Sequence, residues 1–334
     1  MQNDEMVDID SRLVIECHEM DEHANDFARD VLQGLASTPK RIPSVYFYDE
    51  RGSELFEQIC ELPEYYITRT EKSILEQYAP EIVTCSGGEW ALVEFGSGSS
   101  FKTRLLIEAL LEAQGHLHYF PVDISASMLT ESARDLLRDY EKLSITGQVA
   151  EYYHGIELIG QKDLERKLVI FLGSNIGNFE PAQALSFLRA IRDILNPNDL
   201  FLLGTDLEKD SRVLEAAYND RDGVTAEFNL NLLHRINREL GGHFRVDQFD
   251  HQAFYNQTEG RIEMHLRSKK SQQVLIEKAG VTVHFDPGET IHTENSYKYT
   301  LEKLKRMCSQ TGFQLQRQWQ DPRGYFSLNL LAPI

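Results

Sequence analysis

The middle of the chain alternates between unbroken apolar runs and runs in which apolar residues recur every three or four positions. The unbroken runs, which predict buried strands, lie at 90–95, 117–124, 147–154, 168–173 and 200–206. The runs with helical spacing lie at 102–113, 127–140 and 181–195, and the last of them begins with Pro181. Strands separated by helices predict right-handed crossovers. We therefore expect a doubly wound α/β fold with a mostly parallel sheet.

The pattern changes after residue 207. Helical spacing over 208–243 gives way to period-two alternation over 244–286, which predicts antiparallel strands, and the chain ends in a helix and two strands. We expect the doubly wound core to span 77–207 and 299–334. The remaining residues, 1–76 and 208–298, are expected to form a second, discontinuous α+β domain over the strand ends, where ligands bind in open α/β sheets.

Charge excludes some classes of partner. The chain has 334 residues and a formal net charge of −19, which argues against nucleic acid or an anionic membrane as the main partner, since both are polyanions. Residues 1–30 hold ten acidic residues and only two arginines. This segment is expected to be a solvated arm or an exposed helix face.

We expect a monomer, and several features of the chain favour the cytoplasm. No stretch approaches the roughly 20 apolar residues of a membrane helix, and the first residues lack the pattern of a secretion signal. The four cysteines are scattered and are expected to stay reduced. His116 and His118 alternate on a predicted strand without a third ligand nearby, so no metal site is expected.

A glycine-rich turn joins the first predicted strand to its helix. The sequence Glu94-Phe95-Gly96-Ser97-Gly98-Ser99-Ser100 lets backbone N–H groups approach a ligand, and the following helix N-terminus favours negative groups. The second strand ends near Asp123, a carboxylate suited to the hydroxyls of a ribose. Phe101 stands where a dinucleotide loop carries its third glycine, so a nicotinamide cofactor is disfavoured. Lys102 would meet the carboxylate of a methionine moiety, or it is an ordinary solvated helix lysine.

Several sequence strings together resemble one family, the histidine Nα-methyltransferases that form hercynine in ergothioneine biosynthesis. The strings are YDERGSELFEQICELPEYYITRTE (48–71), EFGSGSSFKTRLL (94–106), FLGSNIGNFEP (171–181), AYND…GVTAEFNLNLLHRINRELGG (217–242) and GETIHTENSYKYT (288–300). The resemblance covers residues 40–334. It implies transfer of three methyl groups from S-adenosylmethionine to the α-amine of L-histidine by a Rossmann-like enzyme that ends in a strand hairpin.

The resemblance also implies a role for each matching position. Residues expected to bind S-adenosylmethionine are Gly96, Lys102 (methionine carboxylate), Asp123 (ribose), and Glu151 and Tyr152 beside the adenine, where the family usually has Asp-Phe. Residues expected to bind the amino acid are Tyr65 and Tyr218 on its carboxylate, Asn178 on its amine, and Tyr48, Phe56, Met264, Glu294 and Ser296 around its side chain. Asn178 and Tyr48 are the candidate catalytic residues.

The residue types suit these roles, although simpler interpretations exist. Glu294 and Ser296 alternate on an extended segment and so share a face, where a carboxylate and a hydroxyl can bond both nitrogens of an imidazole. Without the resemblance they are an exposed pair beside a turn. Likewise Asn178 after a glycine is a turn residue, and Met264 is strand core.

Methyl transfer from a sulfonium requires a neutral amine, and α-amines titrate near ~8, so a strong base is not needed. Alignment and exclusion of water are then the main tasks of the protein. Three alternatives stay open: a methyltransferase for another amino acid such as a tryptophan derivative, an NAD-dependent oxidoreductase, and a non-catalytic binding protein with the same fold.

Overall fold

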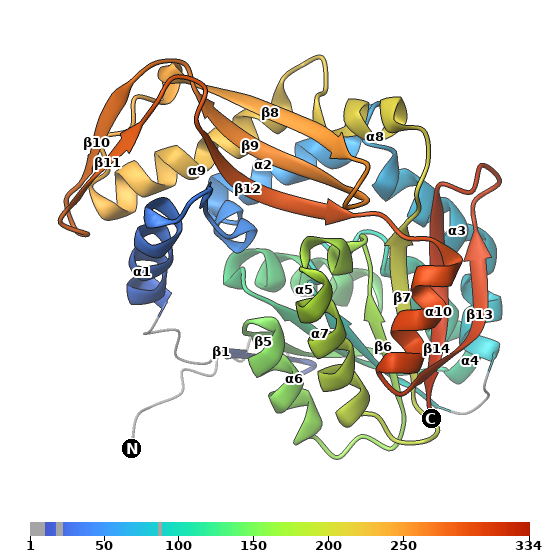
Figure 1. Ribbon diagram of the computed structural model, residues 1–334. Coiled ribbons are helices and arrows are strands. Elements are labelled where there is room, and N and C mark those ends of the chain that lie inside the picture. The colour runs from blue at the N-terminus through green and yellow to red at the C-terminus, as the bar shows by residue number, and fades with distance from the viewer. Residues whose placement is uncertain (1–10, 18–22, 86–88) are drawn as a thin grey trace. The chain divides into compact units, whose positions relative to one another are not determined.

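The computed structural model describes residues 11–17, 23–85 and 89–334, and the chain divides into two compact units (Figure 1). Unit 1 contains the described residues of Met1–Glu19, Ile67–Glu208 and Tyr299–Ile334, and unit 2 those of Met20–Tyr66 and Lys209–Lys298. On the N-terminal side these units differ from the predicted domains, in which residues 1–76 belonged with 208–298. The helix α3 runs unbroken from Tyr66 to Thr84 and belongs to unit 1 from Ile67 onward, and a strand before residue 20 also belongs to unit 1.

Unit 1 is built on an eight-stranded sheet in the order β1-β5-β4-β3-β6-β7-β14-β13. Its strands are β1 (Leu13–Cys17), β3 (Ala91–Phe95), β4 (Leu117–Asp123), β5 (Leu143–Val149), β6 (Lys167–Phe171), β7 (Leu200–Asp206), β13 (Phe313–Gln320) and β14 (Phe326–Pro333). All neighbours from β1 to β7 pair in parallel, whereas β14 pairs antiparallel with both β7 and β13. The predicted parallel core with a closing hairpin is confirmed.

The helices of unit 1 follow the strands as expected for a doubly wound sheet. They are α3 (Tyr66–Thr84), α4 (Arg104–Gln114), α5 (Ala126–Asp139), α6 (Tyr152–Gly160), α7 (Pro181–Asp193) and α10 (Leu301–Gln310), with a short 3-10 helix η2 (Asn175–Asn178) after β6. Local sequence sets their ends. Pro181 opens α7 inside a capping box of Glu180 and Gln183, and Ser125 caps α5.

One predicted strand is placed wrongly. The run 147–154 was expected to be a strand, but β5 ends at Val149 and Tyr152 begins α6 with Glu151 as its N-cap. The apolar character of Tyr152 and Tyr153 extends the apolar run across a loop, so hydrophobicity alone does not mark where the strand stops.

Unit 2 combines a four-stranded sheet, in the order β2-β12-β9-β8, with a separate hairpin of β10 and β11 (Figure 1). The strands are β2 (Lys40–Arg41), β8 (Phe249–Asn256), β9 (Arg261–Ser268), β10 (Gln272–Ile276), β11 (Val281–Phe285) and β12 (Thr290–Tyr297). The helices are α1 (His23–Ala36), α2 (Glu50–Glu61), α8 (Ser211–Tyr218) and α9 (Val224–Leu240), with 3-10 helices η1 (Ser44–Phe47) and η3 (Val246–Gln248). The predicted helical region and the antiparallel strands after it are both present.

Residues 11–17 of the acidic N-terminal segment belong to unit 1 and include a strand, where we expected an arm or an exposed helix face, whereas residues from His23 onward form α1. Residues 1–10 and 18–22 lie outside the described part, but β1 pairs in parallel with β5, and Leu13 and Ile15 are buried. Glu16 accepts a hydrogen bond from Gln148 (2.8 Å) and forms an ion pair with Lys162 (3.2 Å). The surrounding acids conceal the alternation of these two apolar residues in the sequence.

This pairing predicts unequal effects of two substitutions in β1. Ile15→Asp places a charge at a buried position opposite Gly147, so we expect the free energy of unfolding to fall by about 3–5 kcal/mol in urea titrations. Cys17→Asp, at the exposed end of the same strand, is the matched control and should change stability little. Equally small losses for both variants would show that β1 does not contribute to the sheet.

Candidate active site

The glycine-rich turn after β3 forms a tight cradle in unit 1. Gly96 has a φ of +71°, and a Cβ there would lie 3.0 Å from the Tyr152 hydroxyl and 3.2 Å from Asn175 Nδ2. Gly96 N–H donates to Val122 O (2.8 Å), which fixes the turn against β4. A side chain at Gly96 would be strained and crowded, so the position requires glycine.

Asp123 at the end of β4 holds the second half of this turn. Its carboxylate accepts hydrogen bonds from Gly98 N–H (2.8 Å) and Ser125 N–H (2.9 Å). Burial raises the pKa of the Asp123 carboxyl, while these N–H donors oppose the shift. Asp123 therefore links the turn to the start of α5, at the strand end where we expected a ribose-binding carboxylate.

A buried network supports the turn from beneath. The Glu94 carboxylate accepts hydrogen bonds from Thr103 Oγ1 (2.7 Å) and the Tyr119 hydroxyl, and Tyr119 also bonds Ser100 Oγ (3.1 Å). Burial raises the pKa of Glu94 to about 7. Next to this network, the buried Ser97 Oγ has no hydrogen-bond partner, and a polar ligand in the cradle would supply one.

Lys102 meets a carboxylate that the sequence analysis did not identify. Its Nζ forms an ion pair with Glu71 of α3, whose side chain is 0 % exposed. The same carboxylate accepts from Gly173 N–H (2.9 and 3.0 Å), and a Cβ at Gly204 would lie 2.2 Å from its Oε1. Glu71 thus connects α3, the turn before α4 and the loop after β6, and Gly204 makes room for it.

Tyr152 lies on α6, which follows β5, and Asn178 lies on η2, which follows β6 of the same sheet. The Tyr152 ring packs edge-on against Phe171, Phe179 and Phe187, and burial raises the pKa of its hydroxyl. Glu151 is exposed at the N-cap of α6. Asn178 is the last residue of η2 and is half-buried.

The loop between β6 and η2 is held in an unusual conformation. Ser174 has a φ of +59°, and its Oγ accepts from Asp206 N–H (2.9 Å) at the end of β7. A non-glycine residue with positive φ is uncommon and indicates that the surrounding structure constrains the loop. This loop leads directly into the half-buried Asn178.

Unit 2 contains an aromatic cluster formed by residues that the resemblance singled out. Ring centroids lie 5.7 Å apart for Tyr48 and Phe56, 6.3 Å for Phe56 and Tyr65, and 6.2 Å for Tyr65 and Tyr218, each in an edge-on arrangement. Phe228 of α9 completes the cluster through contacts to Tyr48 and Phe56. Burial raises the pKa of Tyr65 well above its usual value, with Tyr218 adding to the effect, so its hydroxyl stays protonated.

A β-bulge in β12 decides which side chains face this cluster. His292 pairs with His265 of β9, whereas Glu294 pairs with Met264, so Thr293 is the extra residue. Thr293 Oγ1 donates to Asn229 Oδ1 (2.8 Å) and Met264 O (3.0 Å), which holds the bulge in place. As a result His292 and Glu294 point to opposite faces of the sheet.

The predicted alternation of Glu294 and Ser296 is present, since they pair with Met264 and Ile262 on one face of β9. Ser296 Oγ accepts hydrogen bonds from the Tyr218 hydroxyl (2.8 Å) and from Lys298 Nζ (2.7 Å). Burial raises the pKa of Glu294 to about 7, and the Lys298 charge opposes that shift. Glu294 also contributes to the raised pKa of Tyr65. These contacts connect the strand to the aromatic cluster.

On the opposite face, Glu263, His265 and His292 form a group that could hold a metal ion, with ligand atoms within 4.8 Å of one another. The histidine rings stack (4.7 Å), and His265 Nε2 bonds the Glu263 carboxylate (3.1 Å). However, Glu263 also forms an ion pair with Arg261 (2.8 Å), and this guanidinium disfavours a cation beside it. We assign no metal to the group.

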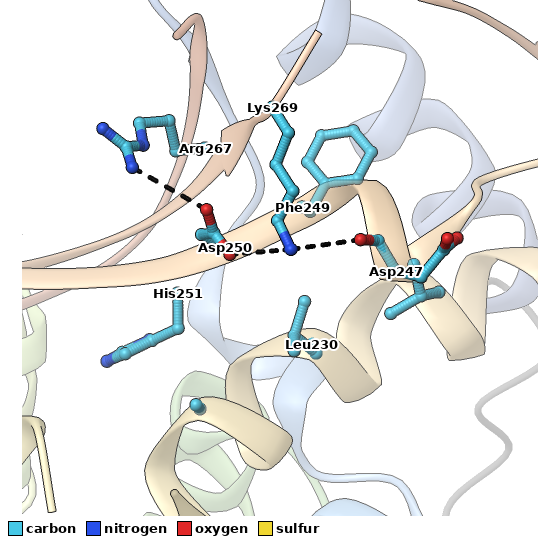
Figure 2. A pocket seen from close by; sticks show the side chains of 9 residues that line it. Leu230, Asp247, Phe249, Asp250, His251, Arg267 and Lys269 are labelled. Carbon is cyan, nitrogen blue, oxygen red and sulfur yellow. Dashed lines mark hydrogen bonds and ion pairs between the residues drawn. The ribbon is translucent and has the colours of Figure 1, made fainter.

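A shallow pocket of about 560 Å³ lies elsewhere on unit 2 (Figure 2). Its lining residues are Ala226, Leu230, Val246, Asp247, Phe249, Asp250, His251, Arg267 and Lys269. Asp250 lies between Lys269 (2.9 Å) and Arg267 (3.7 Å), so the charges at the rim largely neutralise one another. None of the candidate residues lines this pocket.

The candidate residues thus form two groups. One group lies in unit 2 and consists of Tyr48, Phe56, Tyr65, Tyr218, Met264, Glu294 and Ser296. The other group lies at strand ends or adjoining loops of unit 1 and consists of Gly96, Lys102, Asp123, Glu151, Tyr152 and Asn178.

Sequence reasoning missed two residues of these sites, Glu71 and Lys298. Both belong to the quoted strings, and the signal for Lys298 was its position between Tyr297 and Tyr299, whereas Glu71 has polar neighbours and gave no such signal.

Comparison with known proteins identifies the chemistry. Residues 27–333 match the family model described as histidine-specific, S-adenosylmethionine-dependent methyltransferase. The chain is 42% identical to a histidine N-alpha-methyltransferase of Mycolicibacterium smegmatis, over 93% of this chain and 96% of that protein.

Two relatives of lower identity carry other names. The chain is 32% identical to ergothioneine biosynthesis protein 1 of Neurospora crassa, over 88% of this chain but only 33% of that protein. It is 26% identical to an L-tryptophan methyltransferase of Psilocybe serbica, over 89% of this chain and 90% of that protein.

The Glu71–Lys102 pair generates a prediction about stability. Lys102→Met leaves the Glu71 carboxylate buried without its cation, so we expect unfolding free energy to fall by about 3 kcal/mol, near the lower end for a buried pair because Lys102 is partly exposed. The double variant Lys102→Met/Glu71→Gln should recover most of this loss, because glutamine still accepts from Gly173 N–H without a charge.

Urea titration of both variants measures the effect. Lys142→Met, which removes an exposed lysine of the same unit, is the control. If the single and double variants lose equal stability, the ion pair does not account for the burial of Glu71.

Proposed function

Because the chain belongs to the family of histidine-specific, S-adenosylmethionine-dependent methyltransferases, we propose that it trimethylates the α-amine of L-histidine to hercynine, a step of ergothioneine biosynthesis. The choice of substrate rests on one observation: Glu294 and Ser296 lie on the same face of β12, beside Met264 of β9. A carboxylate and a hydroxyl are the groups needed to bond the two nitrogens of an imidazole.

The residues of unit 1 fit S-adenosylmethionine, which supplies an electrophilic methyl group on a sulfonium. A Cβ at Gly96 would crowd the Tyr152 hydroxyl and Asn175, and Ser97 Oγ is buried without a partner. We propose that Gly96 lines the methionine moiety and Lys102 binds its carboxylate. Asp123 then takes the ribose hydroxyls, with Glu151 and Tyr152 beside the adenine.

The residues of unit 2 suit the amino acid. The raised pKa of Tyr65 keeps its hydroxyl a hydrogen-bond donor over the working pH range, so Tyr65 is proposed to donate to the substrate carboxylate. Tyr218 packs edge-on against Tyr65 and is proposed to support it at the carboxylate, because its own hydroxyl proton is donated to Ser296 Oγ. Tyr48, Phe56 and Met264 surround the side chain, while Glu294 and Ser296 bond the imidazole. Aromatic walls exclude water and strengthen these polar contacts.

Catalysis is proposed to depend on alignment rather than on a strong base. Asn178 orients the neutral amine so that its lone pair meets the methyl group in line. The proton leaves to water or to a tyrosine, for which Tyr48 is the candidate. Three rounds of methylation require the carboxylate and imidazole to be held firmly while the amine turns between rounds.

A tryptophan derivative is the main alternative substrate, since a relative of similar length methylates tryptophan. An indole offers one N–H donor and no ring-nitrogen acceptor. It therefore leaves either Glu294 or Ser296 without a hydrogen-bond partner, and this lowers the affinity of the site for an indole. A nicotinamide cofactor is disfavoured by Phe101, which occupies the place of the third glycine.

We further propose that the protein acts as a monomer in the cytoplasm without nucleic acid or membrane partners. Net charge of −19 opposes polyanionic partners, and Cys17, Cys60, Cys85 and Cys308 are free thiols. No helix in the described ranges is long and apolar enough to cross a membrane.

Mass spectrometry tests the proposed function directly. Incubation with S-adenosylmethionine and each amino acid in turn should add three methyl masses to histidine and none to tryptophan. Histidine recovered unchanged, or tryptophan methylated in preference, would overturn the assignment.

The same assay with Asn178→Ala tests how the amine is aligned. We expect methylation to fall by 10²-fold or more, on the order of the cost of a misplaced reacting group. The affinity for S-adenosylhomocysteine, measured by calorimetry, should stay unchanged and serves as the control for folding.

The pKa of Glu294 predicts how histidine binding depends on pH. Its carboxyl is mostly protonated at pH 6 and mostly ionised at pH 8, because its pKa is about 7. Only the ionised form is a pure acceptor for an imidazole N–H. Histidine affinity of the wild type should therefore rise roughly tenfold more between these pH values than that of Glu294→Gln.

Calorimetric titration of histidine onto both proteins, saturated with S-adenosylhomocysteine, measures the difference. The titration of free histidine is common to both proteins and cancels in the comparison. Parallel pH dependence in the two proteins would show that Glu294 does not bind the ring as a carboxylate.

A further inference from the structure

Lys298 is a buried lysine that no role described so far uses. It follows β12, and only 1% of the residue is exposed. Its Nζ donates to Ser296 Oγ (2.7 Å) and to the Tyr218 hydroxyl (3.3 Å), and it lies 5.1 Å from the centre of the Tyr218 ring. An ammonium is costly to bury, so its position against two proposed substrate-binding residues calls for a physical reason.

The hydrogen bonds of Ser296 fix the direction in which its proton points. A serine hydroxyl has two lone pairs and one proton. Ser296 Oγ accepts from Lys298 Nζ and from the Tyr218 hydroxyl, so both lone pairs are engaged. Toward a ligand, Ser296 therefore acts as a hydrogen-bond donor and not as an acceptor.

Lys298 acts on Glu294 as well. The two residues are four positions apart on the same segment, and the Lys298 charge favours the ionised form of the Glu294 carboxyl against the effect of burial. Ionised Glu294 is an acceptor without a proton of its own. The same ammonium thus favours one donor and one acceptor on one face of the strand.

We propose that Lys298 is a positioning residue that determines which form of the substrate ring is bound. It fixes Ser296 as donor and Glu294 as acceptor, so the site takes a neutral azole with one N–H and one unprotonated nitrogen. This inference rests on the proposed function and adds a charge state: the site selects neutral imidazole and rejects imidazolium, whose two N–H groups would leave the Ser296 proton facing a donor.

Other groups near Glu294 do not supply this effect. Among the described residues, Tyr65, next to α3, interacts electrostatically with Glu294, and the raised pKa of Tyr65 keeps that phenol neutral. Tyr218 of α8 interacts in turn with Tyr65. On β9 its partner is Met264. Glu263 and His265 belong to the opposite face of the sheet.

The proposal is tested with Lys298→Met, which keeps the length of the side chain and removes its charge. We expect KM for histidine to rise tenfold or more. The acidic limb of the kcat/KM profile should move by about one pH unit to higher pH, because Glu294 then ionises later. Lys298→Arg should return the limb toward its wild-type position. The Kd of S-adenosylhomocysteine should change by less than about twofold.

The position of the limb separates this role from a structural one. Partial unfolding lowers the amplitude of the profile but does not move it along the pH axis, so an unmoved limb in a folded Lys298→Met protein overturns the proposal. Lys278→Met, an exposed lysine of the same unit, is the matched control. Loss of histidine methylation in the wild type would instead contradict the proposed function.

If Lys298→Met does not fold, Ser296→Ala tests the same inference. The comparison uses histidine and β-(pyrrol-2-yl)alanine, whose ring has an N–H but no nitrogen acceptor. The wild type should prefer histidine strongly, and the preference should fall at least tenfold in Ser296→Ala because the donor for the unprotonated nitrogen is gone. An unchanged preference, or a wild type that binds imidazolium better than imidazole, would overturn the inference.

Discussion

The buried carboxylates that hold the loops of unit 1 have hydrogen-bond donors or an opposite charge in place of water. Glu71 is fully buried because Lys102 and the Gly173 N–H occupy its carboxylate. Glu94 accepts from Thr103 and Tyr119 beneath the glycine turn. Burial without such partners costs several kcal/mol, so each carboxylate fixes the elements that supply its partners. The loops of the proposed cofactor site are held largely in this way.

The same constraint works differently in unit 2. Burial raises the pKa of Glu294 to about 7, as it does for Glu94, but the opposing effect on Glu294 comes from the Lys298 charge and not from hydrogen-bond donors. Glu94 is held by its donors beneath the glycine turn, whereas Glu294 lies on the strand face that we propose binds the substrate, so its titration can respond to a ligand. The aromatic rings around Tyr65 exclude water and so maintain this sensitivity.

Sequence patterns predict the sheet well because its strands are buried on both faces and its helices are amphipathic. They fail where local composition hides the pattern. Acidic neighbours conceal Leu13 and Ile15, and tyrosines extend the apparent strand beyond Val149.

The candidate site shows the same division. Gly96, Asp123 and Glu294 are recognisable from motif and resemblance, because a turn, a strand end and a conspicuous string mark them. Glu71 and Lys298 are not, since the role of each depends on partners that only the folded chain brings near: Gly173 lies 102 residues from Glu71, and Tyr218 lies 80 from Lys298.

The bulge at Thr293 carries a consequence for how this protein can change through evolution. Because Thr293 is the extra residue of the bulge, its loss would leave Glu294 opposite Met264 and Ser296 opposite Ile262. Because side chains alternate along a strand, loss of Asn295 would instead move Ser296 and the residues after it to the face opposite Glu294. Substitutions in this segment can alter ligand preference gradually, but a deletion beyond the bulge would disrupt the whole recognition surface at once. New specificities in such a chain are therefore expected to arise by side-chain exchange at constant strand length.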